Sequence, residues 1–242
     1  MKKEEKGYLQ AQRGKKVIRS LVKKLSGRFS VALGINLSSG DSREIFKWFL
    51  ASILFGTRIS ETIVINTYRE FEKEGVLSSD NILNKGWDGL VEILDRGGYV
   101  RYDFKTATRL LDVNGTLMDR YRGDLNILHS LASDPKDLEE RLKALGKGIG
   151  DVTVNIFLRE MRGIWQKAKP LPSELVIMAA RKAGIIPKDL KDKREILEFL
   201  MKKWADEGMK MKDFPDFEAA LLRLGKDFCR KMACKRCPLK EA

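Results

Sequence analysis

The chain has 242 residues, of which 43% are hydrophobic and 33% charged, and it carries a formal net charge of +13. A hydrophobic fraction of this size can form a core in one or two small lobes, which excludes disorder over most of the length. The basic excess indicates a polyanionic partner, with nucleic acid ahead of a membrane surface. The heavy Lys, Glu and Arg content is also typical of a thermophilic protein, and the two interpretations are compatible.

The sequence indicates a cytoplasmic protein that has no membrane partner. No stretch contains eighteen consecutive apolar residues, and the charged start M-K-K-E-E-K is not followed by the apolar run of a signal peptide. Three cysteines, all within residues 229–237, do not form a secreted disulfide framework. We therefore expect a cytoplasmic protein that associates with the nucleoid.

Apolar residues recur at helical spacing through the chain, and no segment alternates convincingly at period two. The helix predicted over 43–55 is apolar nearly all round, which is typical of a helix at the centre of a domain. It ends at Gly-Thr-Arg, and Ser60 begins the next helix. Further helices are predicted near 78–84, 86–95, 103–112 and 114–131. The fold class is therefore predicted to be all-α.

The segment 134–160 is predicted to form two helices joined by a short glycine-rich turn. Asp134 and Pro135 mark a helix start, since the first can cap the N-terminus and the second lacks an N–H that would be unpaired there. The sequence G-K-G-I-G then ends this helix, and a second helical pattern follows at once. Backbone N–H groups at such a tip can bind a phosphate. The alternative is a turn whose glycines serve packing alone.

The C-terminal third is predicted to begin with a proline-containing loop over 162–172, after which Ser173 caps a helix that ends near residue 183. Two further helices are predicted over about 189–206 and 215–228. A short basic tail that contains the cysteines ends the chain.

Three motifs occur in the order in which they occur in the helix-hairpin-helix DNA glycosylase superfamily. They are F-L-A-S-I-L-F-G-T-R at 49–58, Gly98-Tyr99 followed by Lys105-Thr106-Ala107, and L-G-K-G-I-G-D-V-T-V-N at 145–155. The chain resembles this superfamily over most of residues 25–242, and its endonuclease III-like members in particular. The cysteine cluster near the C-terminus adds to the resemblance.

The resemblance implies a two-lobed helical fold that binds double-stranded DNA between the lobes. Residues 1–42 and 166–242 would form the terminal-helix lobe, and residues 43–165 a six-helix barrel lobe with the hairpin at 134–160. The implied DNA-contacting residues of the hairpin are Gly146, Lys147, Gly148, Gly150 and Thr153.

The resemblance also implies a role in base flipping for the turn after the central helix. Thr57 and Arg58 stand where the family places residues that fill the gap left by an extruded base, and flipping a base costs a few kcal/mol of stacking. The alternative is a simple connecting turn between two helices. We expect the protein to act as a monomer.

Two departures from the family pattern concern catalysis. Val152 stands where lyase-type members carry a nucleophilic lysine, so lysine-dependent lyase activity is not expected. The carboxylate that the family places before the next helix is replaced by P-L-P-S-E, in which one alignment selects Pro172 and a shift by two residues selects Glu174. Glu174 could stabilise a cationic sugar electrostatically, or it could be an ordinary acidic residue in the first turn of a helix.

The cysteines follow the spacing C-x4-C-x2-C, at Cys229, Cys234 and Cys237. Endonuclease III-like proteins bind a [4Fe–4S] cluster with four thiolates in a C-x6-C-x2-C-x5-C pattern, and the chain has one cysteine fewer. The alternatives are a cluster completed by a non-cysteine ligand, a zinc site with one further ligand, or a cysteine loop that binds nothing.

Two functions are compatible with these features. The first is a monofunctional DNA glycosylase of base excision repair that acts on a flipped damaged or mismatched base. The second is a catalytically inactive helix-hairpin-helix protein that recognises DNA structure or lesions. The base-flipping features favour the first, whereas Val152 and the displaced acid favour the second.

Overall fold

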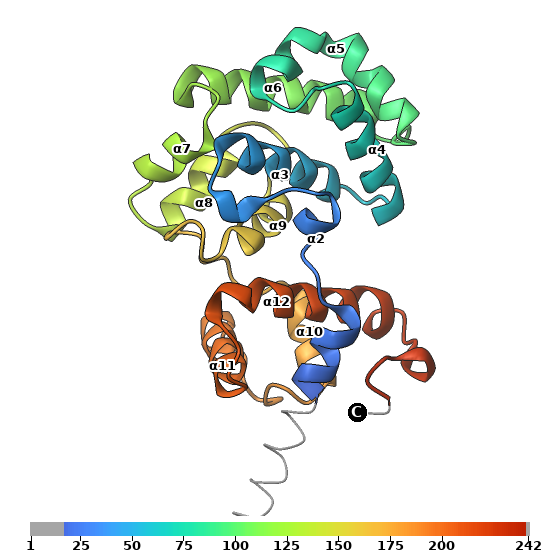
Figure 1. The fold of residues 1–242 in the computed structure, drawn as a ribbon, viewed down its shortest axis with the longest axis vertical. Coiled ribbons are helices and arrows are strands. Elements are labelled where there is room, and N and C mark those ends of the chain that lie inside the picture. Colours follow the sequence, from blue (N-terminus) through green and yellow to red (C-terminus); the bar gives the residue numbers. More distant parts are fainter. Residues whose placement is uncertain (1–16, 241–242) are drawn as a thin grey trace, which may run out of the picture. The chain divides into compact units, whose positions relative to one another are not determined.

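The computed structural model describes residues 17–240, which contain helices and turns and no strand (Figure 1). The predicted all-α class is confirmed. By its internal contacts the chain divides into two compact units. Unit 1 comprises residues 1–29 and 171–242, and unit 2 comprises residues 30–170. The sequence-based terminal lobe began at residue 1, and its residues 1–16, 241 and 242 lie outside the described part.

The division by contacts places residues 30–42 in unit 2, whereas the sequence-based boundary followed residue 42. Hydrogen bonds explain this placement. The Ser30 N–H donates to Glu160 Oε2 at 3.0 Å, and the Ser42 hydroxyl lies 2.7 Å from Asp124 Oδ1. The segment is therefore attached to helices of unit 2 at both of its ends. The second boundary lies after residue 170, five residues beyond the expected position.

Unit 2 is built around one buried helix. Its elements are α2 (Phe29–Ala32), η1 (Leu37–Ser39), α3 (Ser42–Phe55), α4 (Glu61–Lys73), α5 (Ser79–Arg96), α6 (Asp103–Tyr121), α7 (Leu125–Leu131), α8 (Pro135–Lys143) and α9 (Asp151–Met161). Helix α3 packs against α4, α7 and α9. The Trp48 indole donates to the Phe157 carbonyl at 3.1 Å, and Phe49 meets the Phe157 ring edge-on at 5.3 Å. The apolar helix 43–55 is thus the central helix that the sequence predicted.

One predicted break between helices is wrong. Helix α6 continues through residues 113 and 114, where the sequence had suggested a boundary, and it ends at Arg122 and Gly123 instead. Both of these residues adopt left-handed backbone angles, with φ of 55° and 75°. The Gly123 N–H donates to the Leu117 carbonyl, a hydrogen bond typical of an α-helix that ends with a residue in the left-handed conformation. Within α6, the Asn114 side chain donates to the Leu110 carbonyl and stays inside the helix.

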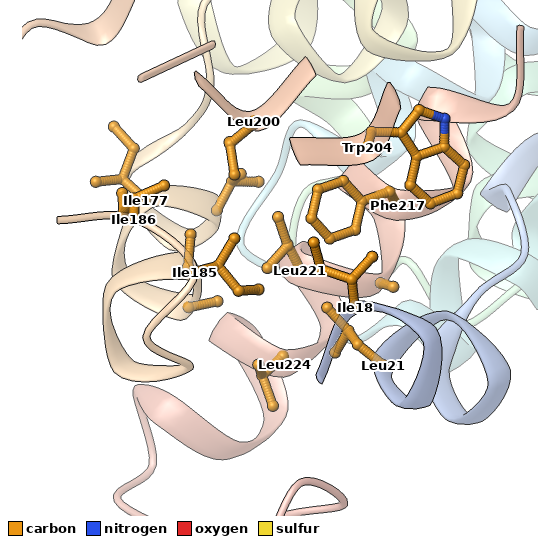
Figure 2. Packing of buried hydrophobic residues seen from close by; sticks show 14 of the residues in the cluster. Ile18, Leu21, Ile177, Ile185, Ile186, Leu200, Trp204, Phe217, Leu221 and Leu224 are labelled. Atoms are coloured by element: carbon orange, nitrogen blue, oxygen red, sulfur yellow. The ribbon is translucent and has the colours of Figure 1, made fainter. Parts of the chain in front are cut away.

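Unit 1 has its own apolar core (Figure 2). Residues 17–25 are helical, and the further elements are α10 (Glu174–Lys182), α11 (Lys193–Asp206), η2 (Met211–Asp213), α12 (Phe214–Arg223), η3 (Leu224–Cys229) and η4 (Cys234–Arg236). Trp204 of α11 stacks on Phe217 of α12 at 5.4 Å. The helix expected over 215–228 widens into a π-helical turn at Leu224. At Gly225 a Cβ would lie 2.3 Å from the Leu175 carbonyl oxygen, so only glycine allows α10 this close.

Candidate functional site

Helices α8 and α9 are joined by residues 144–150 at one end of unit 2. Asp134 caps α8, and its carboxylate accepts from the N–H groups of Lys136 at 2.8 Å and Asp137 at 3.0 Å. Pro135 is the first residue of the helix, as the sequence predicted. Gly150 is the N-cap of α9, and having no side chain it offers no oxygen to the helix start. The N-terminus of α9 is therefore left open.

The tip between the two helices presents several backbone N–H groups. The first-turn N–H groups of Asp151, Val152 and Thr153 have no acceptor inside the helix, because no carbonyl precedes them at the required distance. Within residues 17–240, nothing accepts a hydrogen bond from the N–H of Gly148 or Gly150. Both glycines are exposed. This set of donors, together with the helix dipole, favours an anion at the tip.

Helix α6 contributes a guanidinium to the same tip. Gly148 has a φ of +93°, and a Cβ at this position would lie 2.5 Å from Arg109 Nε. Two residues earlier, a Cβ on Gly146 would lie 2.8 Å from a methyl group of Val113. Gly146 is thus required by the close approach of the turn to α6, and Gly148 by its positive φ. The Arg109 guanidinium therefore lies beside Gly148 in the turn.

Three cations in the turn and on α6 have no anionic partner among the described residues. Lys105 and Arg109 are four residues apart on α6, and Lys147 precedes Gly148 in the turn. Among residues 17–240, none of these three side chains has an ion-pair partner, and none donates a hydrogen bond. We call these three side chains, together with the N–H groups of Gly148, Gly150 and residues 151–153, the hairpin face.

One carboxylate lies at the edge of the hairpin face. Asp151, the first residue of α9, is 87% exposed and forms an ion pair with Lys143 at 2.7 Å. The hydrogen bond from Lys143 holds the pKa of Asp151 below its usual range, and the same bond raises the pKa of Lys143. Asp151 is therefore charged at neutral pH. Lys143 offsets a negative charge that would oppose an anion at the helix start.

The turn after α3 separates its two predicted residues. The Thr57 hydroxyl donates to the Leu54 carbonyl at 3.2 Å and also contacts the hydroxyl of Tyr99. Tyr99 is fully buried, and burial raises its pKa. Thr57 is thus held against the interior of unit 2, whereas Arg58 is exposed. Of the two residues, Arg58 is the one that can reach a ligand outside the protein.

Val152 and Thr153 point to opposite environments. The Val152 side chain is 63% exposed, whereas Thr153 is 3% exposed. A Cβ on Gly56 would lie 2.2 Å from the Thr153 hydroxyl, so this side chain packs against the end of α3. Thr153 can therefore offer only its N–H group to the tip. The exposed Val152 offers no nucleophile.

Glu174 is the first residue of α10, in unit 1. Ser173 caps this helix, with its hydroxyl 3.5 Å from the Val176 nitrogen, as predicted. The Glu174 side chain is 74% exposed and forms an ion pair with Lys193 at 2.7 Å. A carboxylate in water that faces a lysine has the surroundings of an ordinary surface residue. Its catalytic role stays a prediction.

The three cysteines differ in exposure and are all free thiols. Cys229 is buried, Cys237 is partly buried and Cys234 is exposed. Burial raises the pKa of the Cys229 thiol, Lys182 opposes this effect, and the two other cysteines add to it. In the described residues, no three His, Cys, Asp or Glu side chains gather closely enough to hold a metal ion. Three thiols alone do not complete a four-thiolate set, so no chemistry is assigned to a cluster or zinc, and both stay predictions.

Sequence reasoning did not select Lys105 or Arg109 as site residues. The available signal was the spacing Arg101, Lys105 and Arg109, which recurs every four residues on or just before α6. Within residues 17–240, no helix combines the length and apolar character needed to span a bilayer. The chain matches no known protein-family model and no curated protein sequence.

Proposed function

We propose that the protein binds double-stranded DNA through the hairpin face. The observation that supports this proposal is that the Arg109 guanidinium lies beside Gly148, in a turn where the N–H groups of Gly148, Gly150 and the first turn of α9 are open. Amides and guanidinium groups are both donors that phosphate oxygens accept. Contacts of this kind position DNA without reading its sequence, so binding is expected to be independent of sequence and sensitive to salt.

We also propose that the two units correspond to the lobes of a helix-hairpin-helix DNA glycosylase, with unit 2 as the barrel lobe. The order of the central helix α3, the turn with Arg58, the Gly98-Tyr99 pair and the α8–α9 hairpin supports this assignment. The activity proposed is excision of a flipped damaged or mismatched base in base excision repair. Val152 provides no amine, so the reaction proceeds without a lysine Schiff base. The protein acts as a monomer at the nucleoid.

In this proposal Glu174 is the candidate carboxylate that stabilises the cationic sugar. A specific observation favours a second candidate function. Glu174 is exposed and forms an ion pair with Lys193. Its interaction with a cationic sugar would therefore be weakened by water, because burial does not lower the local dielectric constant. A protein with this carboxylate and Val152 could instead recognise DNA structure or lesions without cleaving a bond. Both candidates require the hairpin face.

Substitutions of two glycines test the DNA-binding proposal. Gly148→Val places a branched side chain against the Arg109 guanidinium at a positive φ, and we expect at least about a tenfold loss of affinity for duplex DNA. Gly75→Val is the matched control, because Gly75 also has a positive φ of 67° but lies in the α4–α5 turn with open space around it. We expect that variant to bind within about twofold of wild type.

Gly150→Ala is a second control, because it changes a glycine of the turn and keeps the backbone N–H that would contact a phosphate. A Cβ at Gly150 meets nothing within 4 Å, its φ of −110° suits any residue, and the N–H is retained. We expect this variant to bind DNA within about threefold of wild type. Thermal unfolding of all three variants checks that each is folded. Equal affinities for the Gly148 and Gly75 variants would reject the hairpin face as the binding site.

A panel of duplexes that carry uracil, oxidised or alkylated bases distinguishes the two candidate functions. Formation of abasic sites, followed by strand cleavage in alkali, would establish the glycosylase. In that case Glu174→Gln should abolish release and leave binding unchanged. Tight binding without release from any lesion would instead establish the non-catalytic function. Release by the Glu174→Gln variant at the wild-type rate would remove Glu174 from the active site.

A further inference from the structure

Two aromatic rings form an exposed pair on α5 and α6 of unit 2. Trp87 and Phe104 lie 5.2 Å apart between ring centroids, with their planes tilted by 40°. The Phe104 side chain is 58% exposed and Trp87 is 39% exposed. The neighbouring Val100 is 62% exposed. Apolar area of this kind is costly to leave in water, so its position on a surface needs a reason.

The indole of Trp87 is held in a fixed orientation. Its N–H donates to the Thr108 hydroxyl at 3.1 Å, and that hydroxyl donates to the Phe104 carbonyl at 2.9 Å. These two bonds connect both rings to the same turn of α6. The other three tryptophans of the chain are at most 4% exposed. Trp87 is therefore the only tryptophan whose ring is available for stacking with a ligand.

Two cations that form no ion pair among the described residues stand close to Phe104 in the sequence. Arg101 and Lys105 are exposed, lie on either side of Phe104 in the sequence, and form no ion pair with any of residues 17–240. The Arg101 guanidinium lies 5.4 Å from the ring centre of Tyr102. The carboxylate next to Phe104, that of Asp103, accepts a hydrogen bond from the Phe104 N–H at 2.6 Å. The pair is thus an apolar platform beside which Arg101 and Lys105 form no ion pair with the described residues, while the Asp103 carboxylate interacts with that of Asp95.

We propose that this platform binds single-stranded DNA. Unpaired bases would stack on the rings of Trp87 and Phe104, and Arg101 and Lys105 would contact the phosphates on either side. A purely apolar partner would leave both cations without a counter-charge, whereas a single strand presents flat rings and phosphates alternately. Stacking does not distinguish one base from another, so the binding is independent of sequence.

The platform and the hairpin face share helix α6 and the cation Lys105, whereas the two aromatic rings belong to the platform alone. Phe104 and Arg109 are five residues apart on α6, which is a rise of roughly 7.5 Å and a turn of roughly 140° about the helix axis. The two surfaces are therefore separate sites. The inference goes beyond duplex binding and does not depend on it, since a free single strand can occupy the platform alone.

Tryptophan fluorescence of the full chain provides a direct test. The probes are a short oligothymidylate and an abasic oligomer of the same length, which carries the same phosphates but no bases. We expect the oligothymidylate to quench the Trp87 emission and to bind about fivefold to a hundredfold more tightly than the abasic oligomer. Equal affinity and equal quenching for the two oligomers would overturn the proposal, because binding would then need no stacking.

Two phenylalanine variants locate the site. Phe104→Leu should lower the affinity for oligothymidylate by at least about fivefold and leave the affinity for duplex DNA within about twofold of wild type. Phe199→Leu in unit 1 is the matched control, because Phe199 is partly buried and has the Lys203 ammonium 5.4 Å from its ring. Equal losses for both variants would place the stacking elsewhere.

The outcome is independent of the fate of the hairpin proposal. Gly148→Val should weaken duplex binding and leave the fluorescence response to oligothymidylate intact. Loss of the fluorescence response in Phe104→Leu with normal duplex binding supports the platform alone. A wild-type response in Phe104→Leu, together with weak duplex binding in Gly148→Val, supports the hairpin alone.

Discussion

Two surfaces of unit 2 carry positive charge, and they differ in what surrounds it. On α4 and α5, Arg96 contacts Glu70 at 3.1 Å and Glu74 at 2.8 Å, and Lys85 contacts Glu74 at 3.0 Å. The hydrogen bond from Lys85 lowers the pKa of Glu74, so these charges are matched at neutral pH. We call this the paired face. On the hairpin face, Lys105, Arg109 and Lys147 have no such partners among the described residues.

The difference shows which of the basic side chains behind the net charge of +13 are available to a ligand. A paired cation gains little from a phosphate, because it must first give up its carboxylate, whereas an unpaired cation gains the whole interaction. Total charge alone predicts a polyanionic partner but not its position. The arrangement of partners predicts that DNA is bound at the hairpin face and not at the paired face.

The largest expected effect comes from reversing one charge on each face. Arg109→Glu should lower the affinity for duplex DNA by at least about tenfold, since a repulsive carboxylate would then lie beside the phosphate. Arg96→Glu changes the net charge by the same amount and should lower the affinity by less than about twofold at moderate salt. Fluorescence anisotropy with a labelled duplex measures both. Equal losses would mean that only the total charge matters.

A substitution at Asp151 should strengthen DNA binding at the hairpin face. Removing its charge in Asp151→Asn should raise the affinity for duplex DNA by about twofold to fivefold, because a carboxylate at the helix start no longer opposes the phosphate. Glu140→Gln is the control, as Glu140 also contacts Lys143, at 3.2 Å, but belongs to α8. A gain of the same size in both variants would show that Asp151 has no special position.

Acid should affect the region behind the hairpin more than the paired face. His129 stacks on Trp165 at 4.7 Å, and Trp165 meets Phe157 of α9. His129 Nε2 is buried and has no hydrogen-bond partner among residues 17–240. Burial, with a smaller effect of Lys167, holds the pKa of His129 below its usual range. The unfolded chain therefore binds a proton at a pH at which the folded protein does not, and stability falls as the pH falls below about 6.5.

The size of this effect is limited by one titrating group. The free energy of unfolding should fall by at most about 1.4 kcal/mol per pH unit from this histidine. His129→Phe keeps a flat ring against Trp165 and should flatten the dependence of the melting temperature on pH between about 5 and 7. An unchanged pH dependence in this variant would show that other groups control acid stability.

The smallest expected effect concerns stability. Arg96→Gln removes three surface ion pairs, with Glu70, Glu74 and Glu92, and should lower the free energy of unfolding by about 0.2–1 kcal/mol, since such pairs are partly exposed and screened by salt. Lys147→Gln removes no ion pair and should leave stability unchanged. Urea denaturation measures the free energy of unfolding of both variants. Equal losses of stability would show that the ion pairs of Arg96 do not stabilise the fold.

Local signals in the sequence predicted much of the fold. Two helix starts were visible in the sequence. The side chains of Asp134 and Ser173 accept hydrogen bonds from backbone N–H groups two or three residues later, and Pro135 has no N–H that needs an acceptor. The apolar helix 43–55 is central because no face of it suits water. The break at 122–123 was missed because Arg122 adopts a left-handed conformation, which is uncommon for a residue other than glycine.

The candidate site was predictable only in part, because its remaining features depend on packing between distant segments. The glycines of the turn are visible in the sequence, but the position of Arg109 beside Gly148 depends on how α6 approaches the hairpin. The burial of Thr153 depends in the same way on Gly56, at the end of α3. The ion pair between Glu174 and Lys193 joins two helices of unit 1, and no local pattern indicates it.

The salt dependence of duplex binding tests the central claim most directly. Wild type is compared with two variants that lose the same net charge. One is Lys105→Gln/Arg109→Gln/Lys147→Gln on the hairpin face. The other is Lys73→Gln/Lys85→Gln/Arg96→Gln on the paired face, to which Lys73 belongs through its ion pair with Glu70 at 3.9 Å. Each lost phosphate contact should reduce the slope of log affinity against log salt by about 0.9. We predict a reduction of about 2–3 for the hairpin-face variant and close to zero for the paired-face variant. Equal slopes for the two variants would contradict the account.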